Sequence, residues 1–73
     1  MIENEEIARE VSNLMIDFSH RLDASVARVQ DRGTDEEFKT YRRAVGKVLG
    51  EMLLEIMNPL YAQHPNLKPD GLK

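Results

Sequence analysis

A carboxylate and an imidazole stand three residues apart in this sequence, as Asp17 and His20. Helical bundles use such a pair to hold metal ions, because residues three apart lie on one helix face. Glu10, Glu51 and Glu55 could add carboxylates from the same side of a helical hairpin. The pair lies far from the apolar stripe of its helix, however, whereas bundle metal ligands point inward. We therefore expect no metal or other cofactor, and a divalent-metal-binding bundle is a second alternative.

The densest run of basic residues comprises Lys39, Arg42, Arg43 and Lys47. On a helix these side chains could contact the phosphates of a nucleic acid. Acidic residues 35–37 precede the run, and the net charge of −3 disfavours non-specific binding to nucleic acid or to an anionic membrane. A nucleic-acid-associated regulator that uses this stripe is therefore an alternative interpretation, and we expect no nucleic-acid partner.

The sequence offers no arrangement of residues that would support catalysis. It contains no nucleophile paired with a base, no glycine-rich phosphate loop and no pair of acids expected to be buried together. It also lacks cysteine, which excludes disulfides and thiolate metal sites. We expect the protein not to be an enzyme.

Length and composition indicate one small globular domain. The 73 residues are 41% hydrophobic, which is too high for a fully disordered chain. The acidic N-terminus lacks the apolar core of a signal peptide, and no apolar run reaches the length of a membrane span. We therefore expect a cytoplasmic protein without a membrane segment.

Apolar residues recur at spacings of three and four along two stretches, which predicts helices over about 4–31 and 35–57. Between them, Gly33 can adopt the left-handed conformation that ends a helix. Thr34 and Glu37 have the spacing of a capping box, which begins the next helix. So short a link makes the helices antiparallel neighbours. The fold class is therefore all-α, an antiparallel two-helix hairpin.

The turn is centred near Gly33 and Thr34, so residues that face each other across the hairpin should have numbers that sum to about 67. This relation tests the register. Every pair is then apolar: Val29 with Phe38, Leu22 with Val45, Phe18 with Leu49, Leu14 with Leu53, Val11 with Ile56, and Ile7 with Leu60. Since Ile7 needs cover, we expect the helix to kink or restart at residues 58–59 and to continue to about residue 63, although Pro59 removes a helical hydrogen bond.

The chain should therefore divide into two parts. Residues 1–64 form the helical hairpin, and residues 65–73, which contain two prolines and a glycine, form an extended C-terminal tail. His64 stands next to the tail, and we expect its side chain to be exposed.

A second apolar face is expected on one flank of the hairpin, when residues are placed at about 100° intervals. Nine small or apolar residues gather there: Ala8, Ser12, Met15, Ser19, Val26, Gly46, Gly50, Leu53 and Met57. A lone two-helix hairpin has no closed core, and large apolar patches are rarely left open. The sequence thus predicts a homodimer that forms a four-helix bundle through this flank.

The function expected from this pattern is binding rather than chemistry. The protein is interpreted as a small homo-oligomeric helical interaction protein, whose partner is a second copy of itself or an unidentified protein. Lys39 and Arg42 near the turn, and Glu5 at the opposite end, favour an antiparallel dimer. Ile16 and Leu54 stay on outer surfaces without an assigned role.

Overall fold

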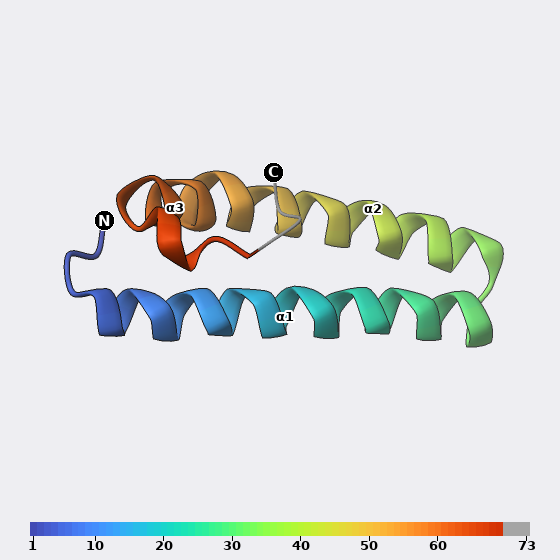
Figure 1. Ribbon diagram of the computed structural model, residues 1–73. Coiled ribbons are helices and arrows are strands. Elements are labelled where there is room, and N and C mark those ends of the chain that lie inside the picture. The colour runs from blue at the N-terminus through green and yellow to red at the C-terminus, as the bar shows by residue number, and fades with distance from the viewer. Residues whose placement is uncertain (70–73) are drawn as a thin grey trace.

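The computed structural model describes residues 1–69, which form two long antiparallel helices joined by a tight turn (Figure 1). Helix α1 spans Glu5–Arg32 and helix α2 spans Asp35–Met52. The predicted all-α antiparallel hairpin is therefore confirmed, with helix bounds close to those expected from the apolar spacing.

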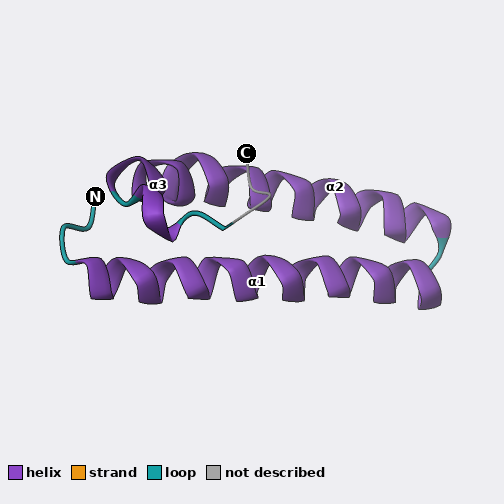
Figure 2. Ribbon diagram, in the orientation of Figure 1, coloured by secondary structure: helices purple, strands orange, loops and turns teal. Residues whose placement is uncertain are grey.

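The second arm of the hairpin continues beyond α2 in three short elements. Leu53–Met57 form one stretch of π-helix, α3 spans Asn58–Gln63, and Pro65–Leu67 form a 3-10 turn. In Figure 1, α3 and the residues after it turn back toward α1 at the open end of the hairpin. Figure 2 shows loops only at the N-terminal residues, at the turn and around the 3-10 turn within the described chain.

The turn between the long helices is built from local side-chain bonds. Thr34 Oγ1 accepts the backbone N–H of Glu37 at 3.1 Å, and Glu37 Oε1 accepts the N–H of Thr34 at 2.8 Å, so the predicted capping box is present. Gly33 is extended, with φ −97° and ψ 179°, rather than left-handed as expected. Its role is steric, because a Cβ there would lie 2.8 Å from the carbonyl oxygen of Val29.

The π-helix ends at Met57, two residues before Pro59, and it explains how the helix passes this proline. Proline has no N–H, and its ring clashes with the carbonyl of the residue four positions earlier. In the wider π-helix, the N–H of Asn58 donates to Leu53, five positions back. The helical backbone then restarts at Asn58 and reaches Gln63, as the sequence predicted.

The hydrophobic core lies at the open end of the hairpin. Its buried members come from α1, α2, the π-helix and α3: Ala8, Met15, Met52, Met57, Leu60 and Tyr61. Leu60 is completely buried, which agrees with the expectation that residues beyond Pro59 complete the core. The residue buried on α1 at this level is Ala8, however, while Ile7 is 49% exposed.

The predicted register was therefore wrong in the rotation of α1. Leu14 and Phe18, expected to face α2, are 58% and 46% exposed. The face of α1 that is turned inward carries Met15 and the two small residues Ala8 and Ser12. Small side chains leave room for α3 to pack closely, and the larger residues of α1 are thereby turned to one flank.

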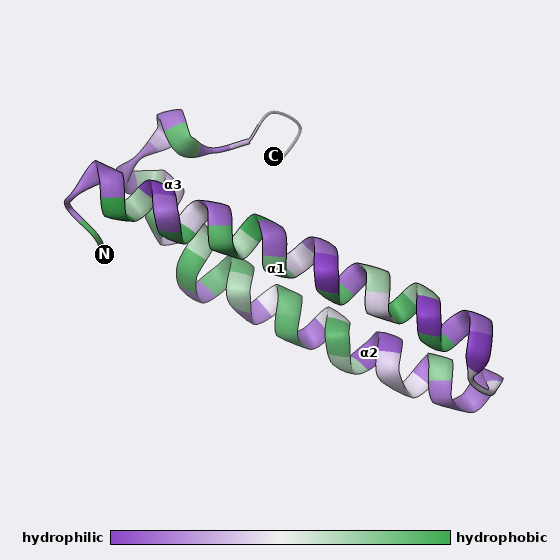
Figure 3. Ribbon diagram, turned by 90° about the horizontal axis from the view of Figure 1, so that it is seen from below, coloured by the Kyte–Doolittle hydropathy of each residue, from purple (hydrophilic) through white to green (hydrophobic). Residues whose placement is uncertain are grey.

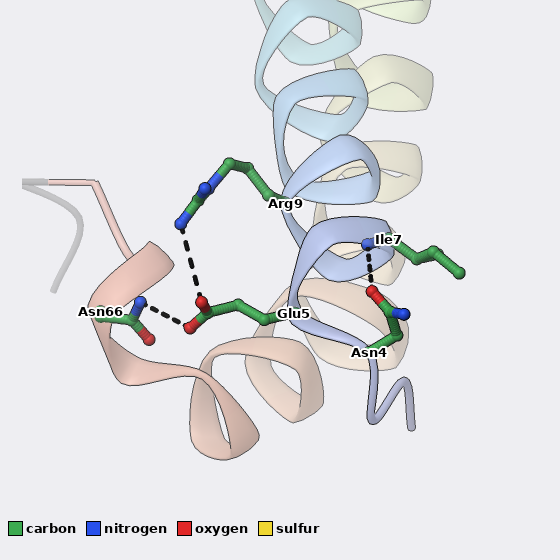
Figure 4. A network of polar contacts seen from close by, with 5 residues as sticks. All are labelled: Asn4, Glu5, Ile7, Arg9 and Asn66. Atoms are coloured by element: carbon green, nitrogen blue, oxygen red, sulfur yellow. Dashed lines mark hydrogen bonds and ion pairs between the residues drawn. The ribbon is translucent and has the colours of Figure 1, made fainter.

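Polar bonds hold the C-terminal segment, residues 60–67, against the start of α1. The hydroxyls of Ser12 and Tyr61 are hydrogen-bonded at 2.6 Å in the interior. His64 Nε2 donates to the carbonyl oxygen of Ile2 at 2.6 Å. Asn66 Nδ2 donates to Glu5 Oε1 at 2.8 Å, as Figure 4 shows. The same Glu5 carboxylate pairs with an arginine of α1, and Asn4 caps this helix (Figure 4).

Two expectations about the chain end are corrected by these bonds. His64 is only 9% exposed, because its ring is used to bind the N-terminal residues. Pro65–Leu67 form a 3-10 turn instead of an extended tail, and Leu67 packs partly against the core. The last residues of the expected tail, 70–73, lie outside the described residues.

Candidate functional site

Exposed apolar side chains gather on both long helices. Ile7, Leu14 and Phe18 of α1 are each about half exposed, and Val48 of α2 is 47% exposed. Figure 3 shows apolar residues, in green, recurring along α1 and α2. These four side chains are large, and water covers a substantial part of each of them. We call this group the apolar face.

The members of the apolar face lie on one flank of the hairpin. At about 100° per residue, the three residues of α1 lie about 60° to 100° to one side of the buried Met15. Val48 lies about 60° to the same side of the buried Val45. Because equal rotations on antiparallel helices lead to the same flank, the four side chains form one surface rather than scattered exposures.

A hollow of about 380 Å³ extends the apolar face along α2. It is lined by Lys47, Val48, Glu51, Met52, Glu55 and Ile56. Its walls are almost entirely apolar, although two glutamates and a lysine belong to them. The hollow is open and shallow, so it suits the side chains of a protein surface better than an enclosed small molecule.

The opposite flank is covered at the open end by the chain itself. Tyr61 binds Ser12, and Asn66 binds Glu5. Ser12 and Glu5 lie about 60° and 80° from Met15 in the direction away from the apolar face. The views in Figures 1 and 3 agree that α3 and the residues after it lie beside the first half of α1.

The nine residues predicted at a dimer interface differ in how far they are buried within the single chain. Ala8, Ser12, Met15 and Met57 are buried inside the single chain. Ser19, Val26 and Gly50 are partly buried, while Gly46 and Leu53 are exposed. A dimer through this flank stays a prediction. The C-terminal segment of the same chain, however, already covers part of the apolar flank that a second chain was expected to cover.

The fold does not place the two candidate metal ligands beside further ligands. Asp17 and His20 are both exposed on α1. Within residues 1–69, no three histidine, aspartate or glutamate side chains converge closely enough to hold an ion. The arrangement of these residues therefore offers no support for the metal-binding alternative.

Three of the four residues of the basic stripe share one surface depression. Lys39, Arg42 and Arg43 line a shallow hollow of about 390 Å³ on α2. Lys47 instead lines the hollow beside Val48. The stripe is thus divided between two surfaces, and its larger part carries no aromatic side chain on which a base could stack.

Sequence reasoning missed the polar pairs that cross between helices. Tyr61 pairs with Ser12, and Tyr41 OH lies 2.7 Å from Ser25 Oγ. The hydroxyl of Ser25 also donates to the Leu22 carbonyl at 2.6 Å, so the tyrosine is the donor in the second pair. The two serines could have predicted these pairs, because the hydroxyl of a buried tyrosine requires a polar partner.

Comparison of the sequence with protein-family models, with curated proteins and with solved structures found no match. Among residues 1–69, no helix is both long enough and apolar enough to cross a membrane.

Proposed function

We propose that this protein is a non-catalytic interaction protein that pairs with a second copy of itself through the apolar face. The observation that carries the proposal is the clustering of Ile7, Leu14, Phe18 and Val48 on one flank, each about half exposed. Contiguous apolar patches on small proteins mark interaction surfaces, whereas single exposed apolar residues are ordinary.

The size of the chain supports self-association. A chain of 73 residues buries a modest fraction of its surface, and it has no disulfide to compensate. The core of the hairpin is concentrated at the open end, where α3 closes it. A second hairpin laid on the apolar face would remove the exposed half of each side chain from water, which is worth about 1 kcal/mol per side chain.

The assembly that follows is a four-helix bundle with two layers of two helices. Two antiparallel hairpins with apolar flanks can close a common core in this way, and two-fold symmetry uses the same surface on both copies. Such a bundle would act by binding, and it would present its outer charged surfaces, including Lys39, Arg42 and Arg43, to any further partner.

The molar mass in solution tests the proposal. Sedimentation equilibrium at micromolar concentrations should give twice the mass of the 8.4 kDa chain. The mass should fall toward that of one chain only on strong dilution, because dimerisation follows mass action. A folded monomer throughout the micromolar range would contradict the proposal.

A further inference from the structure

The hollow beside Val48 has the spacing of a site that receives one side chain of a facing helix. Four of its lining residues, Val48, Glu51, Met52 and Glu55, stand at positions i, i+3, i+4 and i+7. When helices pack side by side, four residues of one helix form the hole into which a side chain of the other is inserted. The walls of the hollow are almost entirely apolar, so the two glutamates line it with their methylene groups.

Leu14 is the side chain of the apolar face that protrudes most. It is 58% exposed, more than Ile7, Phe18 or Val48. It lies about 100° from the inward Met15, so it points almost at right angles to the plane that contains the two long helices. The apolar face thus carries a protruding leucine on α1 and an open hollow on the second arm of the hairpin.

The leucine and the hollow lie at the same level along the hairpin. Ser25 and Tyr41 are hydrogen-bonded across the helices at 2.7 Å, so they mark one level. Leu14 lies eleven residues before Ser25, and Met52 lies eleven residues after Tyr41. Since each residue adds about 1.5 Å along a helix, Leu14 stands level with Met52 and with the hollow around it.

One symmetry axis brings these two features together without a shift. A two-fold axis parallel to the helices leaves every residue at its own level and stacks α1 of each copy on the second arm of the other. Leu14 of each copy then stands over the hollow of the other copy. An axis perpendicular to the helices would stack α1 on α1 and the second arm on the second arm, so Leu14 would not reach the hollow. The parallel axis therefore makes the flank complementary to itself, as a two-fold interface requires.

Phe18 and Val48 fit the same arrangement. Each lies seven residues from the hydrogen-bonded pair of Ser25 and Tyr41, so the two share a level. Each also lies about 60° from the inward direction of its helix, toward the middle of the flank. An axis parallel to the helices gathers these two side chains and their two copies into one apolar layer.

The area of the flank is sufficient for a stable dimer. The hairpin measures 44 Å by 19 Å by 16 Å. One long face therefore covers roughly 700–800 Å², close to the area of about 800 Å² per partner in a stable interface of standard size.

We infer that Leu14 of each copy is inserted into the hollow beside Val48 of the other copy, with the turns of the two hairpins at the same end. This inference rests on the self-association proposed above and names the contact that joins the copies. The antiparallel dimer expected from the sequence concerned the opposite flank, on which Glu5 and Arg42 lie. On the apolar face, the shapes of the two helices select the orientation.

Two substitutions that compensate for each other test the contact. Leu14→Ala removes the protruding side chain, and Glu51→Phe fills the hollow with an aromatic ring. Each change occurs twice per dimer, so each single variant should raise the dimer Kd by roughly 10-fold or more. In the double variant the ring takes the space left by the leucine, so its Kd should be nearer to the wild-type value than to the product of the two increases.

Controls separate packing from charge and from folding. Glu51→Gln removes the same charge without filling the hollow, so its Kd should stay within about threefold of the wild-type value. Leu14 and Glu51 are exposed in the single chain, and circular dichroism should confirm that each variant is helical. Increases that multiply in the double variant would show that the two residues do not meet, and would overturn the inference. A monomeric wild type would instead overturn the proposed self-association itself.

A distance measurement tests the orientation without changing the contact. The sequence has no cysteine, so Arg32→Cys gives one spin-label site per chain, exposed at the end of α1 beside the turn. With the turns at the same end, the labels should lie within about 25 Å, because packed helices are 8–10 Å apart. With the turns at opposite ends, a perpendicular axis through the middle of the hairpin would separate the labels by about 40 Å, and that result would overturn the inference.

Discussion

Replacing Leu60 with alanine should lower the free energy of unfolding by about 2–5 kcal/mol, the usual cost of a cavity left by a buried leucine. Leu60 is completely buried in the core at the open end. It also lies in α3, whose packing holds Tyr61 against Ser12. Since small domains have only about 5–15 kcal/mol of stability, this loss should leave the variant partly unfolded at moderate temperature.

The matched control for this experiment is Leu54→Ala. Leu54 lies in the adjacent π-helix but is 63% exposed, so its truncation should change the stability by no more than about 0.5 kcal/mol. Urea denaturation at one fixed protein concentration measures both variants, because the proposed dimerisation would make stability depend on concentration. Equal losses for the two leucines would mean that α3 does not close the core.

Replacing Leu14 with lysine should dissociate the proposed dimer while leaving the hairpin folded. Leu14 is 58% exposed in the single chain, so a lysine is easily solvated there. In the dimer, each copy would place an ammonium group without a partner in the apolar interface, and burying an unpaired charge is costly. Because this happens twice per dimer, the Kd should rise by at least about 100-fold.

Leu54→Lys is the control for this change, since it introduces the same charge at a leucine of similar exposure. Leu54 lies nine residues from the inward Val45, which is about half a turn away at 100° per residue, on the outer side of the second arm of the hairpin. Sedimentation equilibrium should find the Leu54 variant dimeric and the Leu14 variant monomeric. Dissociation of both, or of the Leu54 variant alone, would place the interface elsewhere.

The hairpin could be predicted from the sequence because its signals are local. Apolar spacing of three and four identified both helices, and the side chains of Thr34 and Glu37 identified the start of α2. The continuation past Pro59 was also predictable, because an apolar residue, Leu60, stood where the core needed cover. The helices and the capping box depended on residues a few positions apart, and the short turn then set which residues of the two arms lie at the same level.

The rotation of α1 could not be predicted in the same way, because it depends on residues far apart in the sequence. Phe18 is more hydrophobic than Ser12, so the apolar pattern placed the phenylalanine inside and the serine on a flank. In the structure, the hydroxyl of Tyr61 bonds to Ser12, and the C-terminal segment fills the space beside it. The proline-containing sequence around Pro65 gave no sign that it would fold back.

This difference also explains why the candidate surface changed flank. The spacing of apolar residues indicated that a two-helix hairpin leaves one apolar flank uncovered, and a second chain was expected to cover it. The C-terminal segment covers that flank at Ala8 and Ser12, while Leu14 and Phe18 are left on the other. The spacing of apolar residues thus predicted that one apolar flank of the hairpin is left exposed. Which of the two flanks is exposed depended on tertiary packing.

The most direct test of the self-association proposal is an isotope-filtered nuclear Overhauser measurement on a mixture of labelled and unlabelled copies. It detects only protons of two different chains that are close together in space. We expect intermolecular contacts from the ring of Phe18 to Phe18 and Val48 of the other copy, within the apolar face. Contacts confined to the flank of Gly46 and Gly50, or no intermolecular contacts at all, would contradict it.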